Sequence, residues 1–266
     1  MTDNPFDRLA RFYDWDHADL LDDLPFYRGL AERLGGPILE AACGSGRLLI
    51  PLAQAGHEVV GLDSSAAMLA LARDRLGAQP GLSDRVELVE GDLRLARLGR
   101  RFGLIILALD AFGLLVERTA QLEALETLRQ HLRVRGLLAI DVANGNLRGA
   151  EGTEETVIQR HGPFGPTGAS LTRWVVRRTD HGTQVDRLLQ LYDETGPDGV
   201  VRRTAVELQQ RYFTRFELEL LLERAGYVVE AVFGDYDLTP FGPASPRLLV
   251  IAHAVSGKPA GRRRVL

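Results

Sequence analysis

The sequence has a single cysteine, Cys43, and no apolar stretch of the roughly 18 residues that a membrane-spanning helix needs. One cysteine excludes an internal disulfide framework and fits a reducing compartment. The first residues, MTDNPFDRLARFYDWDHADLLDD, are acidic and lack the positive-then-apolar order of a secretion signal. We therefore expect a cytoplasmic protein that is not inserted in a membrane.

An excess of positive charge is also missing. Lys and Arg number 32 against 36 Asp and Glu, which gives a net charge of −4. A protein that grips phosphate backbones normally presents a basic face, so a nucleic-acid substrate is disfavoured. The one basic cluster, KPAGRRR over residues 258–264, is predicted to be a solvated tail.

Metal-ligand spacing is absent as well, because no two histidines lie on one helical turn. We therefore expect no metal site. The histidines are His17, His57, His131, His161, His181 and His253.

What the sequence does contain, from Pro37 to about Asn144, is an alternation of apolar runs with helix-like segments. This order is typical of parallel βαβ units with right-handed crossovers. Expected strands are PILEAAC, HEVVGLD, VELVEGD, FGLIILALD and LLAIDVAN, and expected helices are RLLIPLAQAG, SSAAMLALARDRLG and residues 117–132.

A different pattern follows, with partly alternating polarity and turn signals at Asp180-His181-Gly182 and around Gly196-Pro197. It predicts an inserted antiparallel sheet of three strands, SLTRWVVRRTD, TQVDRLLQLYDET and VVRRTAVELQQRYF. A helix, TRFELELLLERAG, and an antiparallel strand pair, YVVEAVFGDYD and RLLVIAHAV, then complete the first sheet. The fold class is thus α/β, a Rossmann-like seven-stranded mixed sheet with helices on both faces plus the insert.

The predicted division of the chain has five parts. They are an N-terminal helical lid segment (1–36), a cofactor-binding core (37–144), the inserted antiparallel sheet (145–213), the completion of the core (214–256) and a basic flexible tail (257–266).

Small and acidic residues fall where the first three strands end. Gly44 and Gly46 let a ligand approach the backbone between the first strand and its helix. Asp63, at the next strand end, can accept from both hydroxyls of a ribose. Asp92 could receive an adenine amino group, with Leu93 offering its backbone N–H. Ligands of open α/β sheets lie beyond this edge.

These motifs resemble the class I S-adenosylmethionine-dependent methyltransferases, in the small-molecule branch with an N-terminal Tyr-Asp segment. The resemblance covers nearly the whole chain and implies a seven-stranded sheet whose last strand pair is reversed. The matching text is FYDWDHADLLDDLPFY, ILEAACGSGR, GHEVVGLDSSAAMLALAR, VELVEGDLRL and RYFTRFELELLLERAGY.

The resemblance also implies which residues contact S-adenosylmethionine. Ala42, Gly44 and Gly46 would approach the methionine moiety, Asp63 the ribose, Met68 the adenine face, Asp92 and Leu93 the adenine edge, Leu109 the far side, and Tyr13 would close over the methionine end. The cofactor-binding set also includes Glu40 and Ser64.

One departure concerns Ala42, where the family usually carries glycine. Alanine permits close approach if its φ is negative, so this departure is expected to be mild. Cys43 is expected to be a small buried apolar residue rather than a catalytic one.

A nicotinamide-dependent enzyme is disfavoured, because Leu49 occupies the position at which the dinucleotide-binding fingerprint has its third glycine.

Methyl transfer is an in-line displacement, so no catalytic residue is obligatory, and a base is needed only if the nucleophile must lose a proton. The weak catalytic candidates are Asp110, His161 and His181, and the substrate-binding candidates are Asp110, Phe112, Asn144, Trp174 and Tyr212. Asp141 lies inside an apolar strand and needs a partner, so it is expected either to pair with an arginine or to orient a substrate group.

The sequence thus favours transfer of a methyl group to N or O of a small molecule. Two alternatives stay open: a non-catalytic protein that binds S-adenosylmethionine, and an RNA or protein methyltransferase. Exposed antiparallel edges of the insert could join two copies of the chain into a homodimer.

Overall fold

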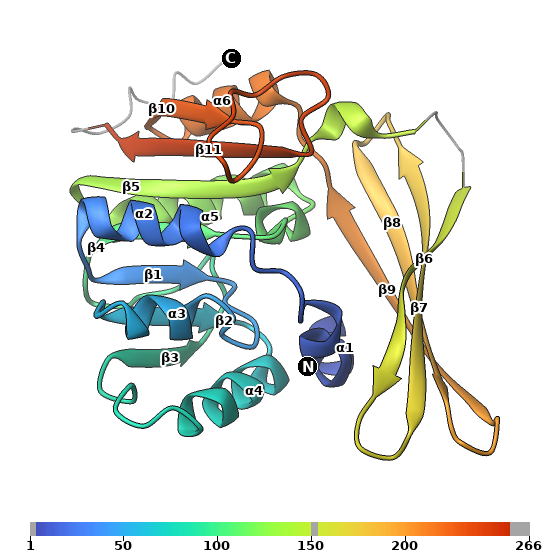
Figure 1. Cartoon of the computed structure of the whole chain (residues 1–266). Helices are drawn as coiled ribbons and strands as arrows, with labels where there is room; N and C mark the ends of the chain where they lie inside the picture. Colours follow the sequence, from blue (N-terminus) through green and yellow to red (C-terminus); the bar gives the residue numbers. More distant parts are fainter. Residues whose placement is uncertain (1–3, 150–153, 256–266) are drawn as a thin grey trace.

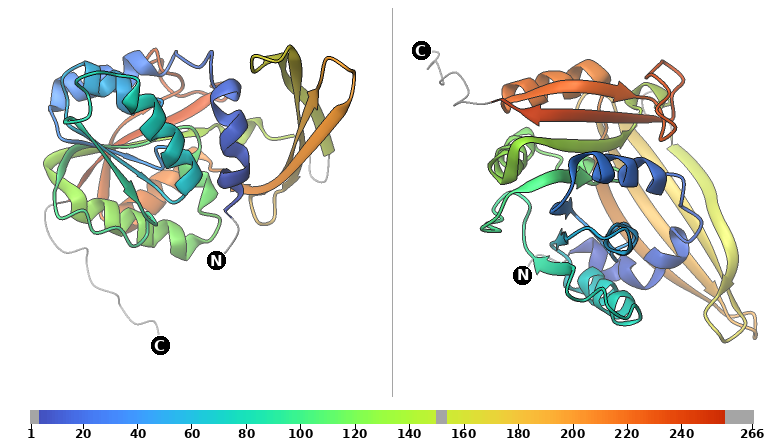
Figure 2. Two further views of the ribbon diagram at one scale, coloured as in Figure 1. Left: turned by 90° about the horizontal axis from the view of Figure 1, so that it is seen from below. Right: turned by 60° about the vertical axis from the view of Figure 1, so that its left-hand side comes forward.

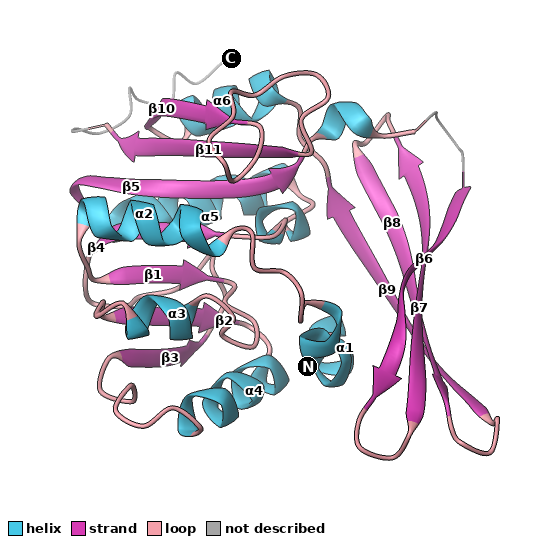
Figure 3. Cartoon of the chain, viewed as in Figure 1, coloured by secondary structure: helices cyan, strands magenta, loops and turns pink. Residues whose placement is uncertain are grey.

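The computed structural model describes residues 4–149 and 154–255, arranged around two sheets (Figures 1 and 3). The basic tail expected over 257–266 lies outside the described residues. The first sheet has seven strands in the order β10-β11-β5-β4-β1-β2-β3, and the second has four in the order β6-β7-β8-β9. Together with the helices, these sheets confirm the predicted α/β fold class with an inserted antiparallel sheet.

The strands of the first sheet are β1 (Ile38–Ala41), β2 (Val59–Asp63), β3 (Val86–Glu90), β4 (Phe102–Leu107), β5 (Leu132–Ala143), β10 (Tyr227–Phe233) and β11 (Arg247–Ala254). Those of the second sheet are β6 (Glu154–Phe164), β7 (Ala169–Asp180), β8 (Val185–Thr195) and β9 (Val201–Arg211). The helices are α1 (Pro5–Asp16), α2 (Leu24–Leu34), α3 (Leu49–Gln54), α4 (Ala66–Gly77), α5 (Arg118–His131) and α6 (Arg215–Arg224), with short 3₁₀ turns η1 (Ala111–Leu114) and η2 (Gly145–Leu147).

Strands β3, β2, β1, β4 and β5 are parallel, whereas β11 is antiparallel to both β5 and β10. The final antiparallel pair is therefore present as predicted. Only β11 runs against the others, because β10, antiparallel to β11, points the same way as β5. The resemblance implied that both strands of the last pair are reversed, but in the structure only β11 is reversed.

Alternate residues of the central strands pack into two apolar layers, one on each face of the sheet. Leu39 and Ile105 point toward α5 and α6, while Ile38 and Leu104 point toward α2 and α3. Burial on both faces explains why these strands read as continuous apolar runs. Among the described helices, none has the length and apolar character that a membrane crossing requires.

The second sheet has one more strand than predicted. Strand β6 pairs with β7 over nearly its full length, at the edge of the sheet. Most of its side chains are exposed, without a buried alternate face. The expectation of three strands was wrong because an edge strand exposed on both sides lacks the period-two apolar pattern that marks a half-buried strand.

Helix α1 lies between the first sheet and the second (Figures 1 and 2). It begins after Asn4, whose side chain accepts the Phe6 N–H and caps the helix. Phe12, on its buried face, stacks on Tyr192 of β8 with ring centroids 4.2 Å apart. On the other side, Asp7 accepts the Ser65 hydroxyl at 2.6 Å. Helix α1 thus ties the start of α4 to the second sheet.

Candidate functional site

The carboxyl ends of β1, β4 and β5 point toward the second sheet, with α1 beside them (Figure 1). Ligands of open α/β sheets bind beyond this edge. The cofactor residues predicted at strand ends follow β1, β2, β3 and β4, which are neighbours in the first sheet.

The loop after β1 contains three residues with left-handed backbone: Ala42 (φ 60°), Gly44 (φ 55°) and Gly46 (φ 78°). A Cβ on Gly46 would lie 3.3 Å from the Cβ of Ala72, so glycine lets the loop pack closely against α4. The negative φ on which a mild effect of alanine depends is not present at Ala42. The chain turns sharply from β1 into the loop at this residue, and alanine accepts a conformation that suits glycine better.

Replacement of Ala42 by glycine should therefore stabilise the protein. Relief of the left-handed penalty, about 1–2 kcal/mol, outweighs the entropic cost of glycine, about 0.5–1 kcal/mol. We expect Ala42→Gly to raise the free energy of unfolding in urea by about 0.5–1 kcal/mol. The matched control, Ala41→Gly in the buried strand β1, should lower it, and a loss in both variants would refute the strain at Ala42.

Asp63, the last residue of β2, links the loop to α4. Its Oδ2 accepts the Gly44 N–H at 2.7 Å and its Oδ1 accepts the Ser65 N–H at 2.8 Å. Burial raises the pKa of the Asp63 carboxyl. An ionised carboxylate has about four acceptor sites, so each oxygen can still accept a ligand hydroxyl. Ser64 is exposed and its hydroxyl accepts from Asn4 at 3.3 Å.

Glu40 is only 4% exposed, and its Oε2 has no hydrogen-bond partner. Burial raises the pKa of Glu40 to about 8, and the nearby Arg47 partly opposes this shift. A buried carboxyl oxygen without a donor is costly and needs a reason. A cationic group from a ligand at this loop would supply the missing donor.

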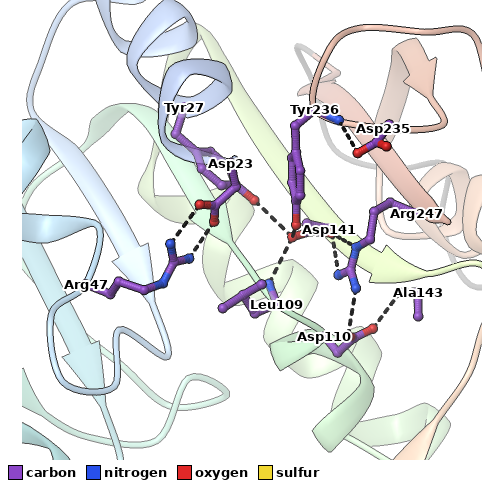
Figure 4. A network of polar contacts seen from close by, with 10 residues as sticks. All are labelled: Asp23, Tyr27, Arg47, Leu109, Asp110, Asp141, Ala143, Asp235, Tyr236 and Arg247. Carbon is purple, nitrogen blue, oxygen red and sulfur yellow. Dashed lines mark hydrogen bonds and ion pairs between the residues drawn. The ribbon is translucent and has the colours of Figure 1, made fainter. Parts of the chain in front are cut away.

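Tyr13 covers the same loop from α1. A Cβ on Gly44 would lie 3.4 Å from the Tyr13 hydroxyl and 3.5 Å from its ring carbons. Burial raises the pKa of Tyr13 far above its ordinary value, so this hydroxyl stays protonated. Arg47, next in the loop, donates to both carboxylate oxygens of the fully buried Asp23 (Figure 4). Sequence reasoning missed this ion pair, because its two residues lie 24 positions apart.

The other predicted cofactor residues are more dispersed. Asp92 is one-third exposed and paired with Arg94, whose hydrogen bonds lower the pKa of Asp92. Leu93 packs at the margin of the core. Met68 is 1% exposed in an apolar cluster that includes Phe12, so it faces α1.

A buried network joins the ends of β4 and β5 (Figure 4). Asp141 accepts from Arg247 Nε at 2.7 Å, from the Tyr236 hydroxyl at 2.8 Å and from the Leu109 N–H at 3.0 Å. The arginine partner expected for Asp141 is thus confirmed. Leu109 and Asp110 both have positive φ, 49° and 64°. Strained non-glycine residues of this kind cluster at functional sites.

The proposed substrate residues do not form one group. Asp110 accepts from Arg247 and the Ala143 N–H, and Asn144 donates to the carbonyls of Pro243 and Ser245. Fully buried Phe112 stacks on Phe213 within the core. Tyr212 hydrogen-bonds His181 at 2.6 Å. His161, on the exposed strand β6, hydrogen-bonds Thr172 of β7, and Trp174 lies beside Asp193 of β8.

The structure instead brings Asp16 and His17 of α1 toward the second sheet, where Asp16 accepts the Tyr192 hydroxyl. Sequence reasoning missed both residues, although His17 follows Tyr13 by four positions, the spacing that stacks two side chains on one helical face. Within residues 4–149 and 154–255, no group of three His, Cys, Asp or Glu side chains could hold a metal ion.

Comparison with known proteins gives a matching family model and similar sequences. A family model described as a methyltransferase domain matches residues 38–136. The cypemycin N-terminal methyltransferase of a Streptomyces species is 26% identical over 218 residues, 82% of each chain. The chain is also 28% identical over 204 residues to the dTDP-3-amino-3,6-dideoxy-α-D-glucopyranose N,N-dimethyltransferase of Streptomyces fradiae, covering 74% of this chain and 72% of that protein.

The chain is a class I S-adenosylmethionine-dependent methyltransferase. The solved structure of the CcbJ methyltransferase from Streptomyces caelestis shares its fold, with a TM-score of 0.80 at 24% identity, covering 95% of this chain and 98% of that one.

The loop of the methyltransferase fits this cofactor. The methionine end of S-adenosylmethionine carries an ammonium group, which is the kind of donor that Glu40 Oε2 lacks. The ribose hydroxyls match the acceptor sites left on Asp63. When bound, the cofactor supplies an electrophilic methyl group on a sulfonium, and the protein has to position the nucleophile and manage its proton.

Proposed function

We propose that this methyltransferase transfers a methyl group to the nitrogen of an amine on a small sugar-like or peptide-like acceptor. Both relatives above are named for amine methylation, one at a peptide N-terminus and one on an amino sugar. The single observation that carries the proposal is the extent of these matches. They span 218 and 204 residues, well beyond the methyltransferase domain at 38–136, and therefore extend outside the cofactor core.

The cofactor is held, in this proposal, by the loop after β1 and by Asp63. Glu40 Oε2 accepts the ammonium of the methionine end, Asp63 accepts the ribose hydroxyls, and Tyr13 closes over the loop at Gly44. The supporting observations are the orphaned buried oxygen of Glu40 and the contact between the Tyr13 ring and Gly44. Ser64, Met68, Asp92, Leu93 and Leu109 remain cofactor contacts predicted from sequence.

The acceptor side lies, in this proposal, between α1 and the second sheet. The Asp16 side chain is 3% exposed, and its Oδ2 accepts the Tyr192 hydroxyl and lies 3.6 Å from Arg173 Nη1. Its Oδ1 is buried without a hydrogen-bond partner. A carboxylate oxygen that lacks a donor suits an acceptor ammonium or hydroxyl, since a neutral carbonyl could not satisfy it.

Replacement of Glu40 by glutamine tests the cofactor side. The pKa of Glu40 is about 8 in the folded protein, against an ordinary 4.5. The contribution of this carboxyl to the free energy of unfolding is therefore fully present below pH 4.5 and is lost as the pH rises through about 8. Glutamine carries no charge, so above about pH 8 the Tm of Glu40→Gln should exceed that of the wild type by at least about 2 °C.

The same variant should bind the cofactor more weakly, by about tenfold in calorimetric titration, because it lacks the negative charge that the ammonium needs. Wild-type binding should also strengthen as pH rises toward about 8. A Tm difference that is the same in acid as in alkaline buffer, or unchanged cofactor affinity, would contradict this role of Glu40.

The function itself is tested by labelled methyl transfer to chosen acceptors. We suggest dTDP-3-amino-3,6-dideoxy-α-D-glucopyranose, a short peptide with a free N-terminus, the same peptide acetylated at its N-terminus, and a simple phenol. We expect methylation of at least one amine and none of the acetylated peptide. Label on the phenol alone would refute N-methylation. Absence of transfer to any acceptor would favour the non-catalytic alternative.

The remaining expectations concern location and assembly. We propose that the protein acts in the cytoplasm on a free small molecule rather than on RNA or a folded protein. The exposed edges of β6 and β9 are the surfaces through which two copies could pair. Salt-sensitive binding to RNA at low ionic strength would favour the RNA alternative.

A further inference from the structure

His17 closes helix α1 one turn after Tyr13, and the two rings stack with centroids 4.1 Å apart and planes at 27°. Tyr13 in turn lies on Gly44 of the cofactor loop. His17 is only partly exposed. The imidazole therefore stands beside the ring that covers the methionine end of the cofactor site, on the side of the second sheet.

The structure also fixes the proton on the His17 ring. Nδ1 lies 2.8 Å from the backbone carbonyl of Tyr13. A carbonyl oxygen can only accept, so Nδ1 must carry the hydrogen. In a neutral imidazole the lone pair is then on Nε2. Within the described ranges, no side chain or backbone group hydrogen-bonds Nε2, so this nitrogen is available to a ligand.

Charged groups face His17 from three elements. Asp16 lies on α1, Arg173 on β7 and Arg47 in the loop after β1. Burial lowers the pKa of His17, and the two arginines lower it further. The hydrogen bond to the Tyr13 carbonyl and the charge of Asp16 act in the opposite direction and raise it. The ring is therefore neutral at pH 7. Asp16 remains close enough to stabilise the cation that forms when Nε2 gains a proton.

We propose that His17 Nε2 is the general base that takes a proton from the acceptor amine, an inference that rests on the proposed N-methylation. The N–H bond of the acceptor ammonium breaks and its electron pair stays on nitrogen, while a new bond forms between the proton and Nε2. The freed pair forms the new N–C bond to the methyl group, while the C–S bond breaks with its electron pair going to sulfur, so that S-adenosylhomocysteine is the leaving group. The imidazolium then returns its proton to solvent.

Other candidate bases are less suitable. Burial raises the pKa of both Tyr13 and Tyr192, so these hydroxyls act as donors at neutral pH. Both ring nitrogens of His181 are hydrogen-bonded, to Tyr212 and to the Gly149 carbonyl. His161 lies on the exposed edge strand β6. His17 alone of these groups combines a free lone pair with contact to the residue that covers the cofactor loop.

The first test needs no acceptor. In the S-adenosylhomocysteine complex of the full chain with ¹⁵N-labelled histidine, NMR should show His17 unprotonated at Nε2 near pH 7. The ring should titrate below the ordinary value of 6.5. Assignment comes from loss of the signal in His17→Asn. A hydrogen on Nε2, or titration at or above the ordinary value, would overturn the proposal.

The second test uses whichever amine probe above the wild type methylates. Asparagine keeps a donor toward the Tyr13 carbonyl but cannot accept a proton, so His17→Asn should lower kcat at pH 7 by about 100-fold. The loss should shrink as pH rises and the amine deprotonates in water, and added imidazole should restore part of it. The matched control, His57→Asn, alters a residue before β2 at the opposite edge of the sheet and should leave kcat unchanged.

Affinity for S-adenosylhomocysteine should be equal in His17→Asn and the wild type. A pH-independent loss of kcat, or a loss of cofactor affinity, would show a structural role and overturn the proposal. Failure of the proposed N-methylation can be distinguished from failure of this proposal. In the first case the wild type methylates neither amine, and the NMR test still shows which nitrogen of His17 carries the hydrogen.

Discussion

Asp63→Ala should weaken binding of S-adenosylmethionine by about 10- to 100-fold. Hydrogen bonds to a charged group contribute about 1.5–3 kcal/mol, and every 1.4 kcal/mol is tenfold in affinity. The variant loses the acceptors for the ribose and also the bonds that hold Gly44 and Ser65 in place. Calorimetric titration measures the change directly.

A matched control is Asp84→Ala, which removes an exposed acid before β3. It should leave the affinity unchanged. Asp92→Ala should cost less than Asp63→Ala, because Asp92 is already paired with Arg94 and partly exposed. Equal affinities for Asp63→Ala and the wild type would contradict the placement of the ribose at β2.

Arg247→Met should lower the free energy of unfolding by about 3–5 kcal/mol, because removal of one partner leaves a buried charge unpaired. Asp141 is 1% exposed, and burial already raises its pKa in the intact protein. Without Arg247 the carboxyl is forced toward its protonated form. The variant should therefore recover stability as pH falls and lose it as pH rises. Urea unfolding at several pH values measures both effects.

The double variant Asp141→Asn/Arg247→Met removes both charges together. It should recover most of the stability lost in Arg247→Met, since the introduced asparagine side chain still offers an oxygen to the Tyr236 hydroxyl. Unfolding of the single variant at the wild-type urea concentration would mean that the ion pair contributes nothing to stability.

Local patterns in the sequence were sufficient to predict the first sheet. The central strands are buried on both faces and end in small or acidic residues, so their identity and their common edge could be inferred from Gly44, Asp63 and Asp92. The antiparallel β10–β11 pair also followed from two apolar runs joined by a turn-rich segment. Such signals depend on near neighbours in the chain.

The features that the sequence concealed depend on contacts between distant segments. Strand β6 is an exposed edge and has no apolar alternation. The positive φ of Ala42 is not signalled by the residue type, because alanine seldom adopts it. The pairing of Arg47 with Asp23 needs α2 to lie against the cofactor loop.

The role of α1 is the largest of these hidden features. Asp16 and His17 read as ordinary polar residues at a helix end. Contacts of α1 with the second sheet, such as the stacking of Phe12 on Tyr192 and the hydrogen bond from Trp15 to the Pro163 carbonyl, bring them there. Trp174 and Tyr212 of the insert were predicted to bind the substrate because they are aromatic. In the structure, however, the polar groups of α1 link the cofactor loop to the insert.

A crystal structure of the full chain with S-adenosylhomocysteine tests the central claim most directly. We predict a ligand amino group within hydrogen-bond distance of Glu40 Oε2, ribose hydroxyls on the Asp63 carboxylate, and the Tyr13 ring over the methionine end. A ligand bound away from the loop that contains Gly44 and Gly46, or with its ribose turned from Asp63, would contradict it.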